Sequence, residues 1–210
     1  MSTPKKYIIE HMESEFSEWV RLEYLAIQKD VGLENFYLSS LPAGTTDADI
    51  PKSLIDNKIQ WTTCEVTKFA EKYPGFDYSR VCLLDPSADQ DICPEDTDKF
   101  DFFLFGGILG DHPPRDRTGE LRKYGFPGRR LGKMQMTTDT AVRVTQLVVE
   151  GQNKLDGINY IDYPEFRFNK MESTEMPFRY VLDAEGKPIL PEGMLDLIKH
   201  DSEKSLDDML

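Results

Sequence analysis

The sequence lacks the features that mark several broad classes of protein. No apolar run in its 210 residues approaches the roughly 20 that a membrane-spanning helix needs, and the segment 102–105 is typical of the longest. Residues 1–6 carry neither a secretory nor a transit signature, and there is no internal repeat. With 39% hydrophobic and 11% aromatic residues, the chain can still form a core. We therefore expect a soluble, cytoplasmic protein with one compact domain and a small appendage at most.

Cysteine is scarce and irregularly spaced. Cys64, Cys82 and Cys93 form an odd number with no C-x-x-C pair. Together with His112 they supply four possible zinc ligands, but the gaps between them match no zinc finger or ribbon. Cys82 stands in an apolar stretch, which is typical of a core position. The sequence therefore indicates no metal site.

Positive charge is also in short supply. Lys and Arg number 25 against 38 Asp and Glu, which gives a formal net charge of −13. Because nucleic-acid binding depends on Lys and Arg, we expect no direct binding of RNA or DNA. The same acidic field attracts cationic partners such as basic proteins. The simpler alternative is an acidic surface that keeps the protein soluble by repulsion.

The chain does contain short apolar runs that alternate with segments of helical period. This alternation predicts an α/β fold with a mostly parallel sheet and helices on both faces. The predicted strands are 7–10, 35–38, 80–84, 102–105 and 158–162, with a weaker one at 59–62. The predicted helices are 16–31, which ends before Gly32, then 139–149, and shorter ones near 118–124 and 191–200.

Two stretches break this alternation. Residues 106–138 are rich in Gly, Pro and charge, and compact domains seldom keep so much irregular chain without a function. Residues 163–210 contain several prolines and a predicted turn at 185–187, and their last ten residues are expected to fray. We therefore divide the chain into a sheet domain, residues 1–162, and a C-terminal appendage, residues 163–210, packed on the same domain.

Ligands of open α/β sheets bind beyond the carboxyl ends of the strands. Three such ends stand out, at residues 84–86, 105–112 and 131–139. The glycines of the second end match neither G-x-G-x-x-G nor the P-loop, so a phosphate cradle is not indicated. They permit close approach to a flat ligand, or they only shape a tight loop. The third end can cap the helix that follows it, or bind a ligand through free N–H groups.

Two carboxylates have surroundings that suit catalysis or cation binding. Asp111 follows the glycine turn and is a better catalytic candidate than its neighbour His112. Glu165 lies among the aromatic residues of the segment 163–168, and rings around an acid suit a slot for a flat cation. The alternative for that segment is an aromatic cluster that closes the core.

Three of these segments together resemble one small family. They are FGGILGDHPPRDR at 105–117, QMTTDTA at 135–141 and DYPEFRF at 162–168. On these runs the sequence resembles the SPOUT-class protein arginine methyltransferases of fungi, which modify small-subunit ribosomal protein three. The likeness extends from Tyr7 to Ile198 and so covers nearly the whole chain. The Ser-Leu-Asn motif of the RNA-methylating SPOUT enzymes is absent, and residues 136–139 stand in its place.

The resemblance implies a fold and a cofactor. The C-terminal part of the sheet would be tied in a deep trefoil knot, a feature that periodicity does not suggest because knots are rare. The protein would be a monomer that binds S-adenosylmethionine at the knot. The implied cofactor-binding residues are Leu84, Asp85, Pro86, Phe105, Gly106, Gly107, Ile108, Gly110, Leu131, Met136, Thr137 and Thr138.

The implied activity is methylation of an arginine in a basic ribosomal protein. Because the pKa of a guanidinium lies above about 12, carboxylates must hold its fork and accept the proton as the new bond forms. The candidates are Asp111 and Glu165, with Asp139 and Glu175 as reserves. Two other functions stay open: an RNA methyltransferase, which is the usual activity of this fold, and a non-catalytic acidic binder of a ribosomal protein.

Overall fold

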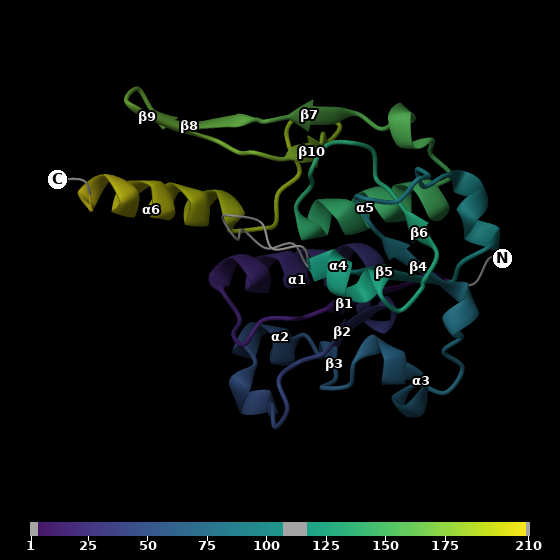
Figure 1. Cartoon of the computed structure of the whole chain (residues 1–210). Coiled ribbons are helices and arrows are strands. Elements are labelled where there is room, and N and C mark those ends of the chain that lie inside the picture. The colour runs from purple at the N-terminus through teal and green to yellow at the C-terminus, as the bar shows by residue number, and fades with distance from the viewer. Residues whose placement is uncertain (1–3, 107–116, 209–210) are drawn as a thin grey trace.

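The computed structural model describes residues 4–106 and 117–208. Its main sheet has six strands in the order β3-β2-β1-β5-β4-β6, and all neighbouring strands run parallel (Figure 1). The strands are β1 (Lys6–Glu10), β2 (Phe36–Ser39), β3 (Gln60–Trp61), β4 (Val81–Leu84), β5 (Phe102–Phe105) and β6 (Gly128–Arg129). The predicted parallel α/β class is confirmed.

Helices cover both faces of this sheet. One face packs against α1 (Glu18–Val31), α2 (Lys52–Asp56) and α5 (Thr138–Val149), and the other against α3 (Phe69–Lys72) and α4 (Arg117–Arg122). Strand β1 serves both layers, because Tyr7 and Ile9 point to the first face and Ile8 to the second. Strands buried on both faces read as continuous apolar runs, which is why β4 and β5 were visible in the sequence.

The first helix has clear local signals at both ends. The side chain of Ser17 accepts a hydrogen bond from the backbone N–H of Val20, and Gly32 ends the helix with a φ of 91°. The buried residues Val20, Tyr24, Ile27 and Val31 lie on the predicted apolar face. The predicted helix began too early, at Phe16, whose ring instead stacks on His11 before the helix starts.

Two strands depart from the predicted arrangement. The segment 158–162 was expected in the main sheet, but β7 (Tyr160–Asp162) pairs with β10 (Arg179–Val181) in a separate antiparallel pair. The sixth strand of the main sheet is β6, within the stretch expected to be irregular. Strand β6 is held by backbone hydrogen bonds from β4 and the residue that follows it. The Leu83 N–H donates to the Pro127 carbonyl, and the Asp85 N–H donates to the Arg129 carbonyl. Two residues are too few to show a strand period.

The C-terminal region packs against the sheet domain through helix α1. It contains the hairpin of β8 (Glu165–Asn169) and β9 (Glu172–Glu175), and α6 (Met194–Asp207) runs beneath that hairpin in Figure 1. Met176, Tyr180, Met194 and Ile198 form an apolar cluster with Leu22 of α1. The predicted turn at 185–187 is present, with Gly186 at a φ of 78°. Helix α6 continues beyond its predicted end at residue 200, through residues that were expected to fray.

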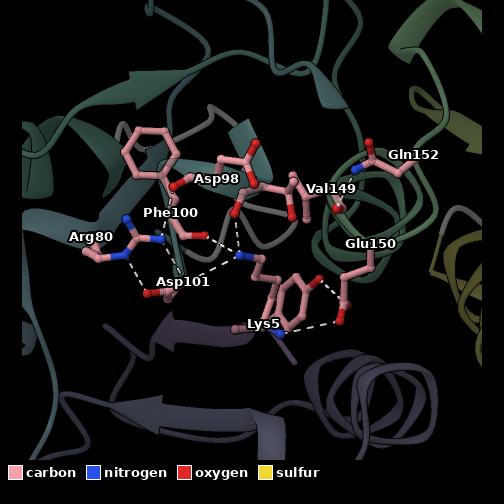
Figure 2. Close-up of polar contacts among 10 residues, drawn as sticks. Lys5, Arg80, Asp98, Phe100, Asp101, Val149, Glu150 and Gln152 are labelled. Carbon is pink, nitrogen blue, oxygen red and sulfur yellow. Dashed lines mark hydrogen bonds and ion pairs between the residues drawn. The ribbon is translucent and has the colours of Figure 1, made fainter. Parts of the chain in front are cut away.

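A polar network closes the amino-terminal edge of the sheet (Figure 2). The Lys5 ammonium is buried and donates to the carbonyl oxygens of Thr97 and Phe100, and it forms an ion pair with Asp101. Arg80 pairs with the same carboxylate. Each of these residues comes directly before a strand or in the loop that leads to one, so the network fixes where the strands start.

Candidate functional site

The three predicted strand ends meet at one edge of the sheet. Strands β5, β4 and β6 are parallel neighbours in that order, so their carboxyl ends lie side by side. Leu84 and Phe105 are the buried last residues of β4 and β5. The loop 131–138 follows β6 and leads into α5. Gly107, Ile108, Gly110 and Asp111 lie outside the described residues.

Asp85 closes the end of β4 through an ion pair. Its carboxylate is buried and accepts from Arg122 Nε at 2.6 Å and Nη2 at 2.7 Å, so helix α4 is tied to the strand end. This pair, reinforced by a bond from the Ser87 N–H, holds the pKa of Asp85 below its ordinary value despite partial burial. Pro86 follows and is exposed. The partner Arg122 was not predicted, because nothing in the sequence links residues so far apart.

Gly106 is required by close packing at the end of β5. A Cβ at this position would lie 3.0 Å from Thr118 Oγ1 and 3.1 Å from the Thr118 backbone nitrogen. Helix α4 therefore packs directly on the strand exit, and a larger residue would push it away. For this glycine the structural explanation is sufficient.

The loop 131–138 is held between α1 and β10. Its residue Gln135 accepts from the backbone N–H of Arg179 at 2.8 Å, and Met136 forms a parallel bridge with the same residue. Leu131 and Met136 pack against the main core. The second half of the loop is thus fixed to β10, which is far away in the sequence.

The start of α5 is capped in an unexpected way. Thr137 is the N-cap residue, but its hydroxyl makes no capping bond and instead contacts Asp139 Oδ1 at 2.8 Å and Thr140 Oγ1 at 2.7 Å. The backbone N–H of Asp139 donates to Glu23 Oε2, 3.0 Å away on α1. Glu23 was missed, although its spacing from Val20 places an acid on the apolar face of α1.

The carboxylates predicted to act in catalysis occupy two different settings. Glu165 and Glu175 face each other as Cα partners across the β8–β9 hairpin, and both are exposed. Asp139 is 1% exposed and lies behind the loop 131–138, with Arg143 Nη1 3.5 Å from its Oδ2. The hairpin is joined to that loop through β10: the Tyr163 N–H, before the hairpin, donates to the Phe178 carbonyl, and the Arg179 N–H donates to the Gln135 carbonyl.

The aromatic residues around Glu165 do not form a slot with it. Phe166 and Phe168 alternate with Glu165 along β8 and pack into the C-terminal apolar cluster, so their rings and the carboxylate point to opposite sides. Tyr163 is half exposed and has a positive φ of 52° at the turn before the hairpin. The alternative interpretation of 163–168, as part of the core, is therefore correct for Phe166 and Phe168.

A second acid at the carboxyl edge was not predicted. Glu10 ends β1, beside β5, and accepts from Ser39 Oγ at 2.7 Å, Ser40 Oγ at 2.6 Å and the Val66 N–H at 2.7 Å. Burial raises the pKa of Glu10, although the three hydrogen bonds lower it in part. The signal was present: a carboxylate directly after an apolar strand, as at Asp85.

Comparison with known proteins decides the family. Residues 6–205 match the family described as "Protein arginine N-methyltransferase SFM1-like". The chain is also 61% identical to the protein arginine N-methyltransferase SFM1 of Saccharomyces cerevisiae, over 98% of this chain and 99% of the relative. The chain belongs to the SFM1-like family.

Solved structures agree with this assignment. A crystal structure of yeast arginine methyltransferase SFM1 complexed with SAM superimposes with a TM-score of 0.91 at 59% identity, covering 96% of this SFM1-like chain and 92% of that structure. A dual specific Trm10 from Thermococcus kodakaraensis matches with a TM-score of 0.50 at 17% identity, over 72% of this chain and 95% of that one. The second likeness concerns the fold alone, and both support the knotted fold that the resemblance implied.

The described residues contain neither a cluster of metal ligands nor a membrane-spanning helix. Among residues 4–106 and 117–208, no group of three or more His, Cys, Asp and Glu side chains has the arrangement of a metal site. None of the helices within the described part of the chain is long and apolar enough to cross a membrane.

Proposed function

We propose that this chain transfers a methyl group from S-adenosylmethionine to an arginine of a basic small-subunit ribosomal protein, as a monomer in the cytoplasm. The observation that carries the proposal is the match to the SFM1-like arginine methyltransferases over residues 6–205, nearly the whole chain. The carboxyl ends of β4, β5 and β6 lie side by side at one sheet edge, where ligands of such sheets bind, and this supports the proposal.

The residues at that edge have the chemistry to hold the cofactor. Leu84, Phe105 and Met136 are buried apolar residues that suit a flat adenine ring. We assign Thr137 and Thr138, at the N-terminal end of α5, to the polar side of the cofactor. Leu131 and the glycines at 106, 107 and 110 complete the proposed set, together with Asp85, Pro86 and Ile108. When bound, S-adenosylmethionine supplies an electrophilic methyl group.

The substrate arginine needs carboxylates that hold its guanidinium and take up a proton. Glu165 and Glu175 lie opposite each other on a hairpin that leads into β10, and Arg179 of β10 bonds to the loop 131–138. Two exposed acids at one cross-strand position repel each other, and a guanidinium between them relieves that repulsion. We assign this role to Glu165 with Asp111, keep Glu175 in reserve, and give the buried Asp139 a supporting role. Alignment of the nitrogen with the methyl group then supplies most of the acceleration.

The net charge of −13 favours a basic protein over RNA as the substrate. Exposed acids line the C-terminal hairpin and α6, among them Glu165, Glu175, Asp201 and Glu203. We propose that the segment 163–210 forms an appendage that carries this acidic surface, with residues 1–162 as the methyltransferase domain. The alternatives are an RNA methyltransferase and a non-catalytic escort of a ribosomal protein.

A labelling experiment separates these three functions. The protein is incubated with radiolabelled S-adenosylmethionine and either the basic ribosomal protein or total RNA, and each product is treated with RNase or protease. Label in RNase-resistant, protease-sensitive material supports the proposal, and mass spectrometry then locates the arginine. Label that RNase removes supports an RNA methyltransferase. Absence of both label and S-adenosylmethionine binding by calorimetry leaves only the escort.

A further inference from the structure

Two acidic side chains are buried together where α1 and α5 pack on each other. Glu23 of α1 and Asp139 of α5 are each 1% exposed. The Asp139 N–H donates to Glu23 Oε2 at 3.0 Å, so one carboxyl oxygen of Glu23 is engaged. Glu23 Oε1 and Asp139 Oδ2 are buried, and among the described residues neither has a partner with hydrogen-bond geometry. Such orphaned oxygens are costly unless something satisfies them.

The surrounding charges do not balance two carboxylates. Arg143 lies 3.5 Å from Asp139 Oδ2, but its Nη2 donates to Asp30 at 2.7 Å, so this guanidinium already serves two acids before Glu23 is counted. The other polar groups that face the pair come from both helices and from β10. They are Trp19 of α1, Thr137 and Thr140 at the start of α5, and Tyr180 of β10, whose hydroxyl is also buried without a partner in the described part of the chain.

One proton satisfies both orphaned oxygens. A protonated Glu23 donates to the carboxylate of Asp139, which leaves a single negative charge opposite Arg143. Burial raises the pKa of Glu23 well above its ordinary value, and the charge of Asp139 and a hydrogen bond to it raise it further. Closely placed carboxylates that hold one proton between them are a known arrangement in proteins.

The pair lies directly behind the loop 131–138. Asp139 follows Thr138, and its carboxylate also holds the hydroxyl of Thr137. Any second negative charge at Glu23 would repel Asp139 and separate α1 from the start of α5.

We propose that Glu23 and Asp139 share one proton, and that the neutral Glu23 is a positioning residue that holds the start of α5 and the loop 131–138 in place for the cofactor. The positioning part rests on the proposed function. Glu23 itself touches neither the methyl group nor the arginine.

Two substitutions at Glu23 test whether a neutral, hydrogen-bonding side chain at this position is enough to hold the cofactor loop. In Glu23→Gln the amide donates to Asp139 and its oxygen still accepts from the Asp139 N–H, so the affinity for S-adenosylmethionine stays within about twofold. In Glu23→Ala both bonds are lost, and the dissociation constant measured by calorimetry rises on the order of 10-fold. Glu18→Gln, an exposed position on the same helix, is the control and leaves binding unchanged. Thermal unfolding shows whether each variant is folded.

A second measurement observes the proton directly. In protein labelled at the glutamate carboxyl carbons, the NMR signal that disappears in Glu23→Gln is expected at a protonated shift at neutral pH. An ionised shift overturns the shared proton. Binding lost equally in both Glu23 variants, or retained in a folded Glu23→Ala, overturns the positioning role. If the wild-type chain does not bind S-adenosylmethionine, the proposed function fails, while the carboxyl signal still decides the shared proton.

Discussion

The two edges of the parallel sheet treat their buried polar groups differently. At the amino-terminal edge the Lys5 ammonium has two carbonyl partners and a carboxylate, and Tyr7 donates to Glu150 at 2.7 Å (Figure 2). At the carboxyl edge, Glu23 and Asp139 each keep a buried oxygen without a hydrogen-bond partner among the described residues. Paired groups fix a structure, whereas unpaired buried groups in a native protein require an explanation.

This difference in hydrogen bonding suggests that the amino-terminal edge stabilises the fold and that the carboxyl edge binds ligands. The network around Lys5 sets where strands begin and contains none of the predicted ligand-binding residues. The other edge carries the ends of β4, β5 and β6, and the acids Glu10, Glu23 and Asp139 are buried near it. Unsatisfied buried groups are tolerated at functional sites because neighbouring structure holds them. Variants at the amino-terminal edge should therefore affect stability alone, and variants at the carboxyl edge should affect cofactor binding or turnover as well.

The largest effect should come from the carboxylates proposed to hold the arginine. In Asp111→Asn combined with Glu165→Gln, neither side chain can accept the proton or pair with the guanidinium charge. We expect turnover to fall at least about 100-fold. Binding of S-adenosylmethionine should not change. Single-turnover labelling of the ribosomal protein measures the first quantity, and calorimetry measures the second.

The hairpin supplies the control for that variant. Glu172→Gln removes the charge of a half-buried acid at the tip of the hairpin, where it accepts from Asn169 and Ser202, and should keep nearly full turnover. Unchanged turnover in the double variant would remove Asp111 and Glu165 from the mechanism. A loss of cofactor binding instead would place them in the cofactor site.

Substitutions at the amino-terminal edge of the sheet should lower the stability of the protein without changing cofactor binding. Lys5→Met leaves the Thr97 and Phe100 carbonyl oxygens without their donor, and we expect a loss of about 2–3 kcal/mol in the free energy of unfolding. Urea denaturation measures it. Lys6→Met, on the neighbouring and less buried residue, should cost less than about 1 kcal/mol. If Lys5→Met changes the dissociation constant for S-adenosylmethionine, the separation of tasks between the edges is wrong.

The same comparison explains what the sequence could and could not predict. Strands β4 and β5 are short apolar runs buried on both faces, and α1 has a serine cap and a terminal glycine. Each of these elements can be predicted because its signals lie in residues that are close in the sequence. Strand β6 has two residues and exists through backbone bonds to β4, which no local pattern encodes. The knot came from the resemblance, because threading of a chain leaves no trace in periodicity.

Some site residues could likewise be predicted from a local sequence pattern, and others could not. The ends of β4 and β5 were predictable because a carboxylate or a glycine after an apolar strand marks the carboxyl edge, whereas no apolar run precedes the loop 131–138. The partners that fix those ends were not, since Arg122 pairs with Asp85 from 37 positions away and Glu23 caps α5 across 116. Glu10 carried the same signal as Asp85 and was overlooked.

A smaller effect, which depends on pH, is expected at the end of β4. The ion pair with Arg122 lowers the pKa of Asp85 below its ordinary value of 3.8, so the ionised carboxylate stabilises the fold above that pH. The contribution is lost as the pH falls through the lower pKa of the folded state. Asp85→Asn should therefore cost about 1 kcal/mol at neutral pH, and the difference from wild type should shrink below 3.8.

Thermal unfolding of both proteins over a series of acidic buffers tests this prediction. Asp89→Asn, an exposed residue of the same loop, is the control and should follow the wild type at every pH. A gap between Asp85→Asn and wild type that stays constant with pH would mean that the pair with Arg122 adds no electrostatic stability.

The smallest effect concerns the acidic surface of the C-terminal hairpin and α6. If the net charge of −13 draws in a basic protein, added salt should screen the attraction and raise the apparent KM for the ribosomal protein about threefold or more between low and physiological ionic strength. The kcat at saturating substrate should stay constant, because the Glu165 carboxylate acts at contact distance, where screening is weak. The dissociation constant of S-adenosylmethionine measured in parallel shows whether salt also disturbs the cofactor. A KM that does not change with salt would leave the acidic surface with the simpler task of keeping the protein in solution.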